Sequence, residues 1–562
     1  MRLQPCLIGA VVGLATAALM LVTEPMLAIV WDEGYTLGRE ARLRDWFRAL
    51  ADPPGFAARW RPPTAELVQQ DGSPPPRPDR IDSRGKLLTD PDVLAWFWPF
   101  AREEPHGHPP FYALLGLAGD VLTPHRANLK RARFGPILLF SVTAGVIFAF
   151  AAGRWGKWPA ALAVGSWVLQ PNLFAHGHYA AYDAVLASLW VLAVVAFCRA
   201  AIPGPEPIGR RSRWAWTVAL GLILGCAAAD KLTGWFLPIP FLAWTAWRRD
   251  KLALGILLIA TAIAGIVLFA MVPPWWTDPI GGVERFLRSN LGRARTIPIR
   301  VEFLGTIYET PRQSLPWYNT IAWTAMVTPV GFLAFALVGL VSAVVRRREE
   351  PIGPLILTHW AFLMLLRSMP HTPGHDGVRL FLPAFGMIAL LGGIGAGALV
   401  TWSLRWGRAA VVAAIAEGLV GLSVMMPVPL SYFSPAVGGL PVAAAVGMEP
   451  TYYWDALVPE ARRWLTDHTG PGESILFATN PTNWQYLRQT GDLPRRIFPI
   501  DPGRPRWYVL QNRPGAFSPL DRTLTREGRA EYVFQKLGVP LVWVFPYSEC
   551  VRLDPVKRRP SS

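Results

Sequence analysis

The sequence predicts an α-helical multispan membrane protein with about eleven transmembrane helices and a small α/β domain at its C-terminal end. Of the 562 residues, 52% are hydrophobic and only 17% are charged, whereas soluble globular domains carry about 25% charged residues. The mean hydropathy is +0.27. Apolar runs of about 17 to 25 residues, each able to cross the hydrocarbon core as a helix, recur along most of the chain. These observations exclude a soluble enzyme.

The apolar runs give the order of the expected spans. The first, 6–22, follows Arg2 and has no convincing small-residue cleavage site before Asp32, so we expect a retained signal anchor. Ten further spans are expected at 134–153, 158–174, 181–201, 214–229, 235–247, 252–272, 321–345, 352–366, 380–401 and 409–426.

Lys and Arg in the short loops predict the orientation. With a cytoplasmic N-terminus, each inner loop carries at least two positive charges, as at Arg346–Arg348, and the short outer loops carry one or none. The outer segment 273–318 disagrees because it holds six arginines, but long loops weigh less in this rule. We expect a multi-pass protein of the plasma membrane, in bacteria the inner membrane, with an extracytoplasmic C-terminal segment.

Two long segments lie on the outer side in this topology. The first, 31–133, ends in a mostly apolar stretch, Pro109 to Leu122, that is too short to cross and is expected to lie along the membrane face. The second, 447–562, lacks apolar runs and is expected to be a soluble α/β domain beside a membrane domain of residues 1–446. In it we expect helices at 455–466 and 531–537 and strands at 474–479, 507–511 and 540–545.

The formal net charge of +16 raises the question of an acidic partner. The basic residues lie in short clusters between apolar runs and not on one aromatic face, so membrane lipids are expected as partners and nucleic acid is not. The four cysteines show no CxxC spacing, which indicates neither a disulfide framework nor a zinc knuckle.

Acidic residues at the outer ends of the expected spans predict a polar site there. Asp32 and Glu33 follow the first span beside Trp31. One carboxylate is expected to accept a proton from an acceptor hydroxyl while the other orients it, the alternative being an ordinary hydrated helix end. Asp183 enters a later span, where a carboxylate is costly unless it faces a polar cavity, so it is a third catalytic candidate.

Histidines supply candidate binding groups at the same end. His106 and His108 lie beside two glutamates and are candidate ligands of a divalent metal, with solvated histidines as the alternative. No other cofactor is indicated. A second H-x-H arrangement ends at His178, shortly before Asp183.

Further candidate substrate-binding residues lie near this end, two of them strongly basic. His375, Asp376 and Arg379 precede the span at 380–401, and Lys231 lies in an outer turn. Arg379 and Lys231 are expected to hold phosphate oxygens, the alternative being snorkelling to lipid headgroups. An unpaired guanidinium at the membrane boundary needs a counter-ion, which a bound phosphate would supply.

Two features inside spans indicate no chemistry. Gly392, Gly393, Gly395 and Gly397 lie in a span without a preceding strand, so close helix packing is expected and a nucleotide loop is not. Glu417 lies in the middle of a span, where we expect it to pair within the bundle.

The order of four motifs resembles glycosyltransferase family 39. The motifs are the Asp-Glu pair after the first span, HPPFY at the end of the first outer loop, an Asp after P-x-x-F-A-H-x-H, and H-D-x-x-R-x-x-x-P before a late span. This family belongs to the GT-C superfamily, with dolichyl-phosphate-mannose protein mannosyltransferases and bacterial lipid A aminoarabinose transferases. The resemblance covers roughly residues 6–426.

The resemblance implies a polyprenyl- or dolichyl-phosphate sugar donor and transfer with inversion, at the outer membrane face, to a hydroxyl of a protein, lipid or glycan. It implies Asp32 as the catalytic residue, with Glu33 adjacent, and it maps the family's second outer-face aspartate onto Asp183. Two other classes stay open. One is a lipid-linked sugar transporter or flippase, in which inverted repeats are expected, and the other is a non-catalytic assembly or sensor protein built around the C-terminal segment.

Overall fold

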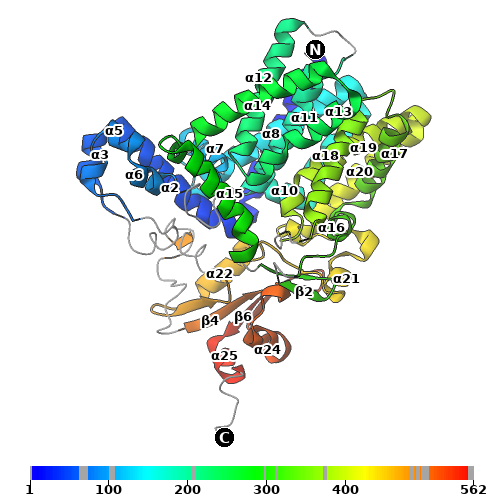
Figure 1. Ribbon diagram of the computed structural model, residues 1–562. Helices are drawn as coiled ribbons and strands as arrows, with labels where there is room; N and C mark the ends of the chain where they lie inside the picture. Colours follow the sequence, from blue (N-terminus) through cyan, green and yellow to red (C-terminus); the bar gives the residue numbers. More distant parts are fainter. Residues whose placement is uncertain are drawn as a thin grey trace.

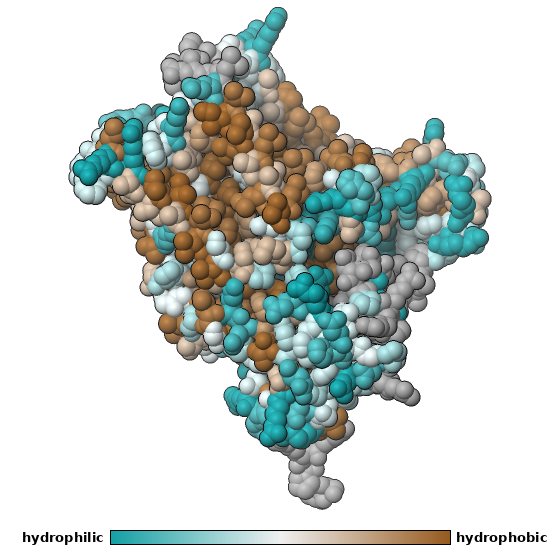
Figure 2. All heavy atoms as spheres, turned by 180° about the vertical axis from the view of Figure 1, so that it is seen from behind, coloured by the Kyte–Doolittle hydropathy of each residue, from teal (hydrophilic) through white to brown (hydrophobic). Residues whose placement is uncertain are grey.

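The computed structural model is mostly helical, with a helical part above a small sheet (Figure 1). It describes residues 3–62, 74–99, 108–204, 209–296, 299–309, 313–370, 372, 376–479, 487–488, 494 and 505–554. A broad hydrophobic surface covers the helical part, whereas the end that carries the sheet is mostly hydrophilic (Figure 2). This distribution is the one expected of a helical bundle in lipid with a hydrated segment at one end.

Six helices in the described part of the chain are long and apolar enough to cross a membrane. They are α1 (Leu3–Thr23), α8 (Asn128–Arg154), α11 (Tyr182–Ala201), α14 (Lys251–Met271), α19 (Pro383–Trp402) and α20 (Leu404–Met425). Shorter helices complete the bundle: α9 (Lys157–Leu169), α10 (Pro171–His178), α12 (Arg210–Ala228), α13 (Pro238–Arg248), α16 (Asn319–Val327), α17 (Val330–Val345) and α18 (Ile352–Ser368). Every expected span falls on one or two of these helices, and the count of about eleven crossings stays a prediction.

Two expected spans are each broken into two helices by a proline. The span expected at 158–174 consists of α9 and α10, which meet at Gln170 and Pro171. The span expected at 321–345 consists of α16 and α17, which meet at Pro329. Proline disfavours helical backbone in the preceding residue and has no N–H for the helix ladder, which explains both breaks.

Close helix packing accounts for the glycine run in α19. A Cβ on Gly395 would lie 2.0 Å from the carbonyl oxygen of Phe335 in α17, and one on Gly339 would lie 1.8 Å from that of Leu391. Only glycine therefore permits this approach of α17 and α19. The expectation of a packing role is confirmed for Gly395.

Glu417 pairs within the bundle with backbone groups. Its carboxylate accepts hydrogen bonds from the N–H groups of Val330 and Gly331, both at 2.7 Å. These groups begin α17 and have no acceptor within that helix. A side chain from α20 therefore caps the helix that the proline break creates.

The two segments predicted to lie on the outer side of the membrane, 31–133 and 273–318, contribute the following elements. The first contains α2 (Trp31–Ala51), α3 (Pro53–Arg59), α5 (Arg84–Thr89), α6 (Pro91–Phe97) and α7 (Phe111–Leu122), and α7 is the apolar stretch expected at 109–122. The segment after α14 contains α15 (Pro279–Thr296) and a hairpin of β1 (Arg300–Phe303) and β2 (Thr306–Glu309). Short 3-10 helices are η1 (Glu24–Met26), η2 (Pro78–Arg80), η3 (Leu232–Phe236), η4 (Pro273–Trp275), η5 (Arg379–Phe381), η6 (Pro429–Ser431), η7 (Pro435–Val437) and η8 (Pro514–Ala516).

The C-terminal segment, residues 447–554, folds around a four-stranded sheet of order β3-β4-β6-β5. In the described residues its strands are β3 (Ser474–Phe477), β4 (Pro505–Gln511), β5 (Tyr532–Lys536) and β6 (Val539–Pro546), of which β3 and β4 pair in parallel and the other neighbours antiparallel. Helices of this segment that the structure describes in full include α22 (Pro459–Asp467), α24 (Pro519–Glu527) and α25 (Tyr547–Leu553), and α21 (Gly439–Ala445) precedes the segment. The expected α/β alternation is present here, and a domain boundary at residue 446 stays a prediction.

The prediction of a helix at 531–537 is wrong, because residues 532–536 of this stretch form β5. The strand pairs with β6 through a turn in which Leu537 and Gly538 have φ angles of 49° and 80°. Two left-handed residues in a row are typical of the tightest hairpins. The missed signal was the Leu-Gly pair between two runs of aromatic and β-branched residues.

The N-terminus and the C-terminal sheet lie at opposite ends of the molecule (Figure 1). The predicted topology, with a cytoplasmic N-terminus and an extracytoplasmic C-terminal segment, requires such a separation. Which end faces the cytoplasm stays a prediction from the loop charges.

Candidate active site

Asp32 and Glu33 lie in the first turn of α2, at the end of the bundle that faces the C-terminal segment. The chain leaves α1 through η1, runs extended to Val30 and then enters α2 at Trp31. The N–H of Val30 donates to Oε2 of Glu33 at 3.1 Å. Carboxylates are favoured at a helix N-terminus because the first N–H groups have no partner within the helix.

The carboxylate of Glu33 is enclosed in an ion pair with Arg133. Arg133 donates from Nε to Oε1 and from Nη2 to Oε2, both at 2.7 Å, and the N–H of Ala180 donates to Oε1 at 2.9 Å. Arg133 also pairs with Glu24 at 3.2 Å, and the exposed fractions of the Arg133 and Glu33 side chains are 1% and 0%. Both oxygens of Glu33 are occupied by protein donors, which is the geometry of a structural ion pair.

The carboxylate of Asp32 is held at one oxygen only. Its Oδ2 accepts hydrogen bonds from Arg379 Nη2 at 2.5 Å, from Tyr182 Oη at 2.5 Å and from Tyr453 Oη at 2.7 Å. Among the described residues, no donor contacts Oδ1, and 14% of the side chain is exposed. Oδ1 is therefore the oxygen that an incoming hydroxyl can reach.

Arg379 contacts three carboxylates at once. It donates from Nε to Asp183 Oδ2 at 3.0 Å, from Nη1 to Asp376 Oδ2 at 3.1 Å and from Nη2 to Asp32. Its guanidinium lies 4.2 Å from the ring centroid of Tyr453. Distant parts of the chain therefore already supply counter-ions for this guanidinium, and a phosphate contact of Arg379 stays a prediction.

Lys231 joins the same group of charges. Its Nζ donates to Asp183 Oδ1 at 2.5 Å and lies 4.6 Å from the ring centroid of Tyr182. Burial lowers the pKa of Lys231 to about 8, although the neighbouring Asp183 carboxylate opposes the fall. We call Asp32, Asp183, Asp376, Lys231 and Arg379, with the hydroxyls of Tyr182 and Tyr453, the Asp32 cluster.

The predicted histidines fall in different places. The ring of His108 lies 3.8 Å from that of Tyr182, at the edge of the Asp32 cluster. His178 lies against the end of α1, with Nε2 3.1 Å from the carbonyl oxygen of Met20 and Nδ1 2.8 Å from that of Phe174. His106 and His375 fall outside the described residues.

The sequence analysis named His106 and His108 as candidate metal ligands, and of these two the structure describes His108. In the described part of the chain, no group of three or more His, Cys, Asp or Glu side chains is arranged to hold a metal ion. A divalent metal stays a prediction.

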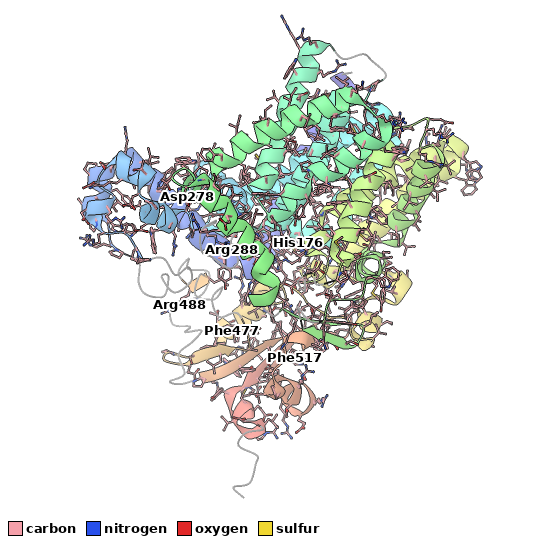
Figure 3. The ribbon with its side chains drawn as sticks, in the orientation of Figure 1. His176, Asp278, Arg288, Phe477, Arg488 and Phe517 are labelled. Carbon is pink, nitrogen blue, oxygen red and sulfur yellow. The ribbon has the colours of Figure 1, made fainter. Side chains whose placement is uncertain are left out.

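Sequence analysis missed the contribution of the C-terminal segment. Tyr453 donates to Asp32, and Arg513, which follows β4, donates to Asp376 Oδ1. The run of three aromatic residues at 452–454 and the Tyr next to Asp183 were available signals, whereas nothing in the sequence marks Arg513. His176 of α10, labelled in Figure 3, lies at this junction, with Nε2 3.3 Å from the hydroxyl of Tyr452.

Comparison with known proteins finds related sequences over one part of the chain and a shared fold over nearly all of it. Residues 107–276 match the family described as dolichyl-phosphate-mannose-protein mannosyltransferase. No curated protein sequence matches the chain.

Among solved structures, the chain is similar to ArnT from Cupriavidus metallidurans. For its apo state the TM-score is 0.51 at 16% identity, over 95% of this chain and 97% of that one. For ArnT bound to undecaprenyl phosphate the TM-score is 0.48 at 14% identity, over 95% of this chain and 97% of that one. The Pmt1-Pmt2 protein O-mannosyltransferase complex of S. cerevisiae gives 0.32 at 14% identity, over 54% of this chain and 38% of that one. Residues 107–276 thus match one family, and nearly the whole chain shares the fold of ArnT.

Proposed function

We propose that the protein is a membrane glycosyltransferase that moves a sugar from a polyprenyl-phosphate donor to an acceptor hydroxyl at the outer membrane face, with inversion. The observation that carries this proposal is the geometry of Asp32, whose Oδ2 is fixed by three donors while Oδ1 has none among the described residues. The family match supports a lipid-phosphate donor. The acceptor is a hydroxyl of a protein, a lipid or a glycan.

In the proposed reaction, Asp32 is the general base. Its Oδ1 takes the proton of the acceptor hydroxyl as the acceptor oxygen attacks the anomeric carbon of the sugar. The bond between that carbon and the phosphate oxygen breaks, and its electron pair leaves with the polyprenyl phosphate. The proton passes from Asp32 to water, and the products are the glycosylated acceptor and the lipid phosphate.

A single displacement fits the number of accessible carboxylates. A retaining reaction needs a second carboxylate that attacks the sugar, with the two carboxyl groups about 5 Å apart in well-studied glycosidases. Asp183 does not offer one, because its oxygens pair with Lys231 and Arg379 and its side chain is 1% exposed. Among the described residues of the Asp32 cluster, the free oxygen is Oδ1 of Asp32, which supports direct displacement and therefore inversion.

Lys231 is the cation that we assign to the leaving phosphate. An ammonium group has three N–H donors, and among the described residues only Asp183 Oδ1 accepts a hydrogen bond from Lys231. Arg379 has partners on all three of its nitrogens, so its proposed task is to hold Asp32, Asp183 and Asp376 in place. A cation beside the phosphate stabilises the charge that develops as the bond breaks.

The test uses the purified full-length chain with a panel of radiolabelled polyprenyl-phosphate sugars. Wild type should transfer the label to an acceptor or slowly hydrolyse the donor, and Asp32→Asn should lower that rate by about two to four orders of magnitude. Asp45→Asn, which changes a less buried acid on the same helix, is the control. Equal rates for wild type and Asp32→Asn across the panel would refute the proposal.

A further inference from the structure

Three consecutive aromatic residues of the C-terminal segment lie against the Asp32 cluster. Tyr453 donates from its hydroxyl to Asp32 Oδ2 at 2.7 Å, and its ring lies under the Arg379 guanidinium. Tyr452 accepts from Asn172 Nδ2 at 3.2 Å, and Trp454 packs against Trp31 with their ring centroids 6.3 Å apart. We call Tyr452–Trp454 the aromatic segment.

The backbone of the aromatic segment is strained and tied to the start of α2. Tyr453 and Trp454 have φ angles of 64° and 62°, in the left-handed region that bulky residues rarely adopt. Such conformations are costly and persist only where surrounding contacts impose them. The carbonyl oxygen of Tyr453 accepts from the N–H of Trp31, the residue before Asp32, at 3.1 Å.

Arg513 makes a second connection from the sheet to the cluster. It follows β4, donates to Asp376 Oδ1, and lies 5.0 Å from the ring centroid of Trp454. Asp376 accepts from Arg379 through its other oxygen, and Arg379 in turn donates to Asp32. The exposed fractions of the Arg513 and Asp376 side chains are 6% and 10%, so these contacts are largely shielded from water.

These contacts point to a role for the C-terminal segment inside the reaction centre. We infer that Tyr453 and Arg513 are positioning residues of the glycosyl transfer: Tyr453 fixes the carboxylate of Asp32 so that Oδ1 faces the acceptor, and Arg513 holds Arg379 through Asp376. The inference rests on the proposed function. It makes the docked C-terminal segment a part of the catalytic centre and not a separate binding module.

The first measurement is kinetic and uses Tyr453→Phe, which removes only the hydroxyl. Hydrogen bonds to charged groups contribute enough that kcat for donor turnover should fall about ten- to hundredfold, with KM for the donor unchanged within about twofold. Tyr532→Phe is the matched control, because its hydroxyl also contacts a carboxylate, that of Glu460 at 3.4 Å, outside the cluster. Wild-type kcat in Tyr453→Phe would overturn the role of Tyr453.

The second measurement needs no activity and uses hydrogen exchange of the full-length chain. In Arg513→Met, amides at 376–382 should exchange at least about threefold faster than in wild type, because their turn loses the contact that fixes Asp376. Arg513→Lys should restore part of the protection. Arg506→Met, a change in β4 at a residue that lies over the ring of Trp507, should leave exchange at 376–382 unchanged.

The two measurements separate the two proposals. Unchanged exchange at 376–382 in Arg513→Met would overturn the role of Arg513 whatever the protein catalyses. A wild-type chain that turns over no donor in the panel would refute the proposed function, and the positioning roles in transfer would fall with it.

Discussion

Asp32 and Glu33 are adjacent acids, yet each pairs with a different arginine, and they differ in how many carboxylate oxygens are occupied and in how exposed the side chain is. Around Arg133, the two oxygens of Glu33 accept four hydrogen bonds from protein groups, and the side chain is 0% exposed. Around Arg379, three donors converge on one oxygen of Asp32, and its side chain is 14% exposed.

The comparison shows that burial and an ion pair do not by themselves mark a catalytic acid. A carboxylate whose oxygens are all occupied stabilises the fold, whereas one with a free, reachable oxygen can accept a proton. We therefore propose a structural role for Glu33 and a catalytic role for Asp32. Each prediction below breaks or sharpens this difference.

The largest effect on stability is expected from Arg133→Met. The change leaves Glu24 and Glu33 buried without their cation, and breaking a buried pair in this way costs about 3 to 5 kcal/mol. The unfolding free energy in detergent measures it. Arg288→Met, which breaks an exposed pair with Glu284, should change stability little, and equal losses in the two variants would contradict the structural role.

A smaller effect, on activity, is expected from Arg379→Lys. An ammonium group cannot reproduce the planar contacts of a guanidinium with three carboxylates, so turnover should stay about tenfold or more below wild type, while Arg379→Ala should be lower still. Donor turnover per folded molecule is the readout. Full activity of the Lys variant would show that the three contacts do not matter for the reaction.

Asp455 sharpens the comparison because it is a buried carboxylate without a cation. Neither oxygen has a hydrogen-bond partner among the described residues, and burial raises the pKa of Asp455 to about 8. The folded protein therefore binds one more proton than the unfolded chain between about pH 4 and pH 8, so wild-type stability falls as pH rises through that range.

Asp455→Asn removes this titration. Its unfolding free energy relative to wild type should be higher at pH 8 than at pH 5 by at least about 1.4 kcal/mol, the equivalent of one pK unit. Unfolding at the two pH values, with Asp467→Asn of α22 as the control, measures the difference. A pH-independent difference would contradict the assignment.

The smallest effect is expected from Glu417→Gln. Glu417 resembles Glu33 in having both oxygens occupied, but its donors are two backbone N–H groups and not a buried cation. The amide of the variant keeps one acceptor and turns a donor toward the other N–H. The unfolding free energy should therefore fall by about 1 kcal/mol, as for the loss of a helix cap. A loss as large as that of Arg133→Met would place Glu417 in the same class as Glu33.

Sequence reasoning predicted the helices well because long apolar runs leave few alternatives. It missed the breaks at Pro171 and Pro329 because each expected span is apolar on both sides of the proline. It also read β5 as a helix, because five residues are too few to separate the two periodicities.

In the candidate site, sequence reasoning found the charges and not their partners. Asp32, Asp183, Lys231, Asp376 and Arg379 were each predicted from their place at the end of a span, and the structure brings them together. Partner choice depends on tertiary contacts: the cation of Glu33 is 100 residues away, and Arg513 lies in another segment. The sequence alone could therefore not predict that Asp32 and Glu33 have different surroundings.

The central claim, that Asp32 acts on the substrate and Glu33 on the fold, is tested most directly by Asp32→Asn and Glu33→Gln in one experiment. Donor turnover per folded molecule and the unfolding free energy are measured for both variants. The account predicts that Asp32→Asn loses about two to four orders of magnitude in turnover and remains folded. It predicts that Glu33→Gln has a lower unfolding free energy than wild type. The turnover per folded molecule of this variant should stay within about tenfold of the wild-type value. The opposite pattern, with turnover lost in stable Glu33→Gln and kept in Asp32→Asn, would contradict it.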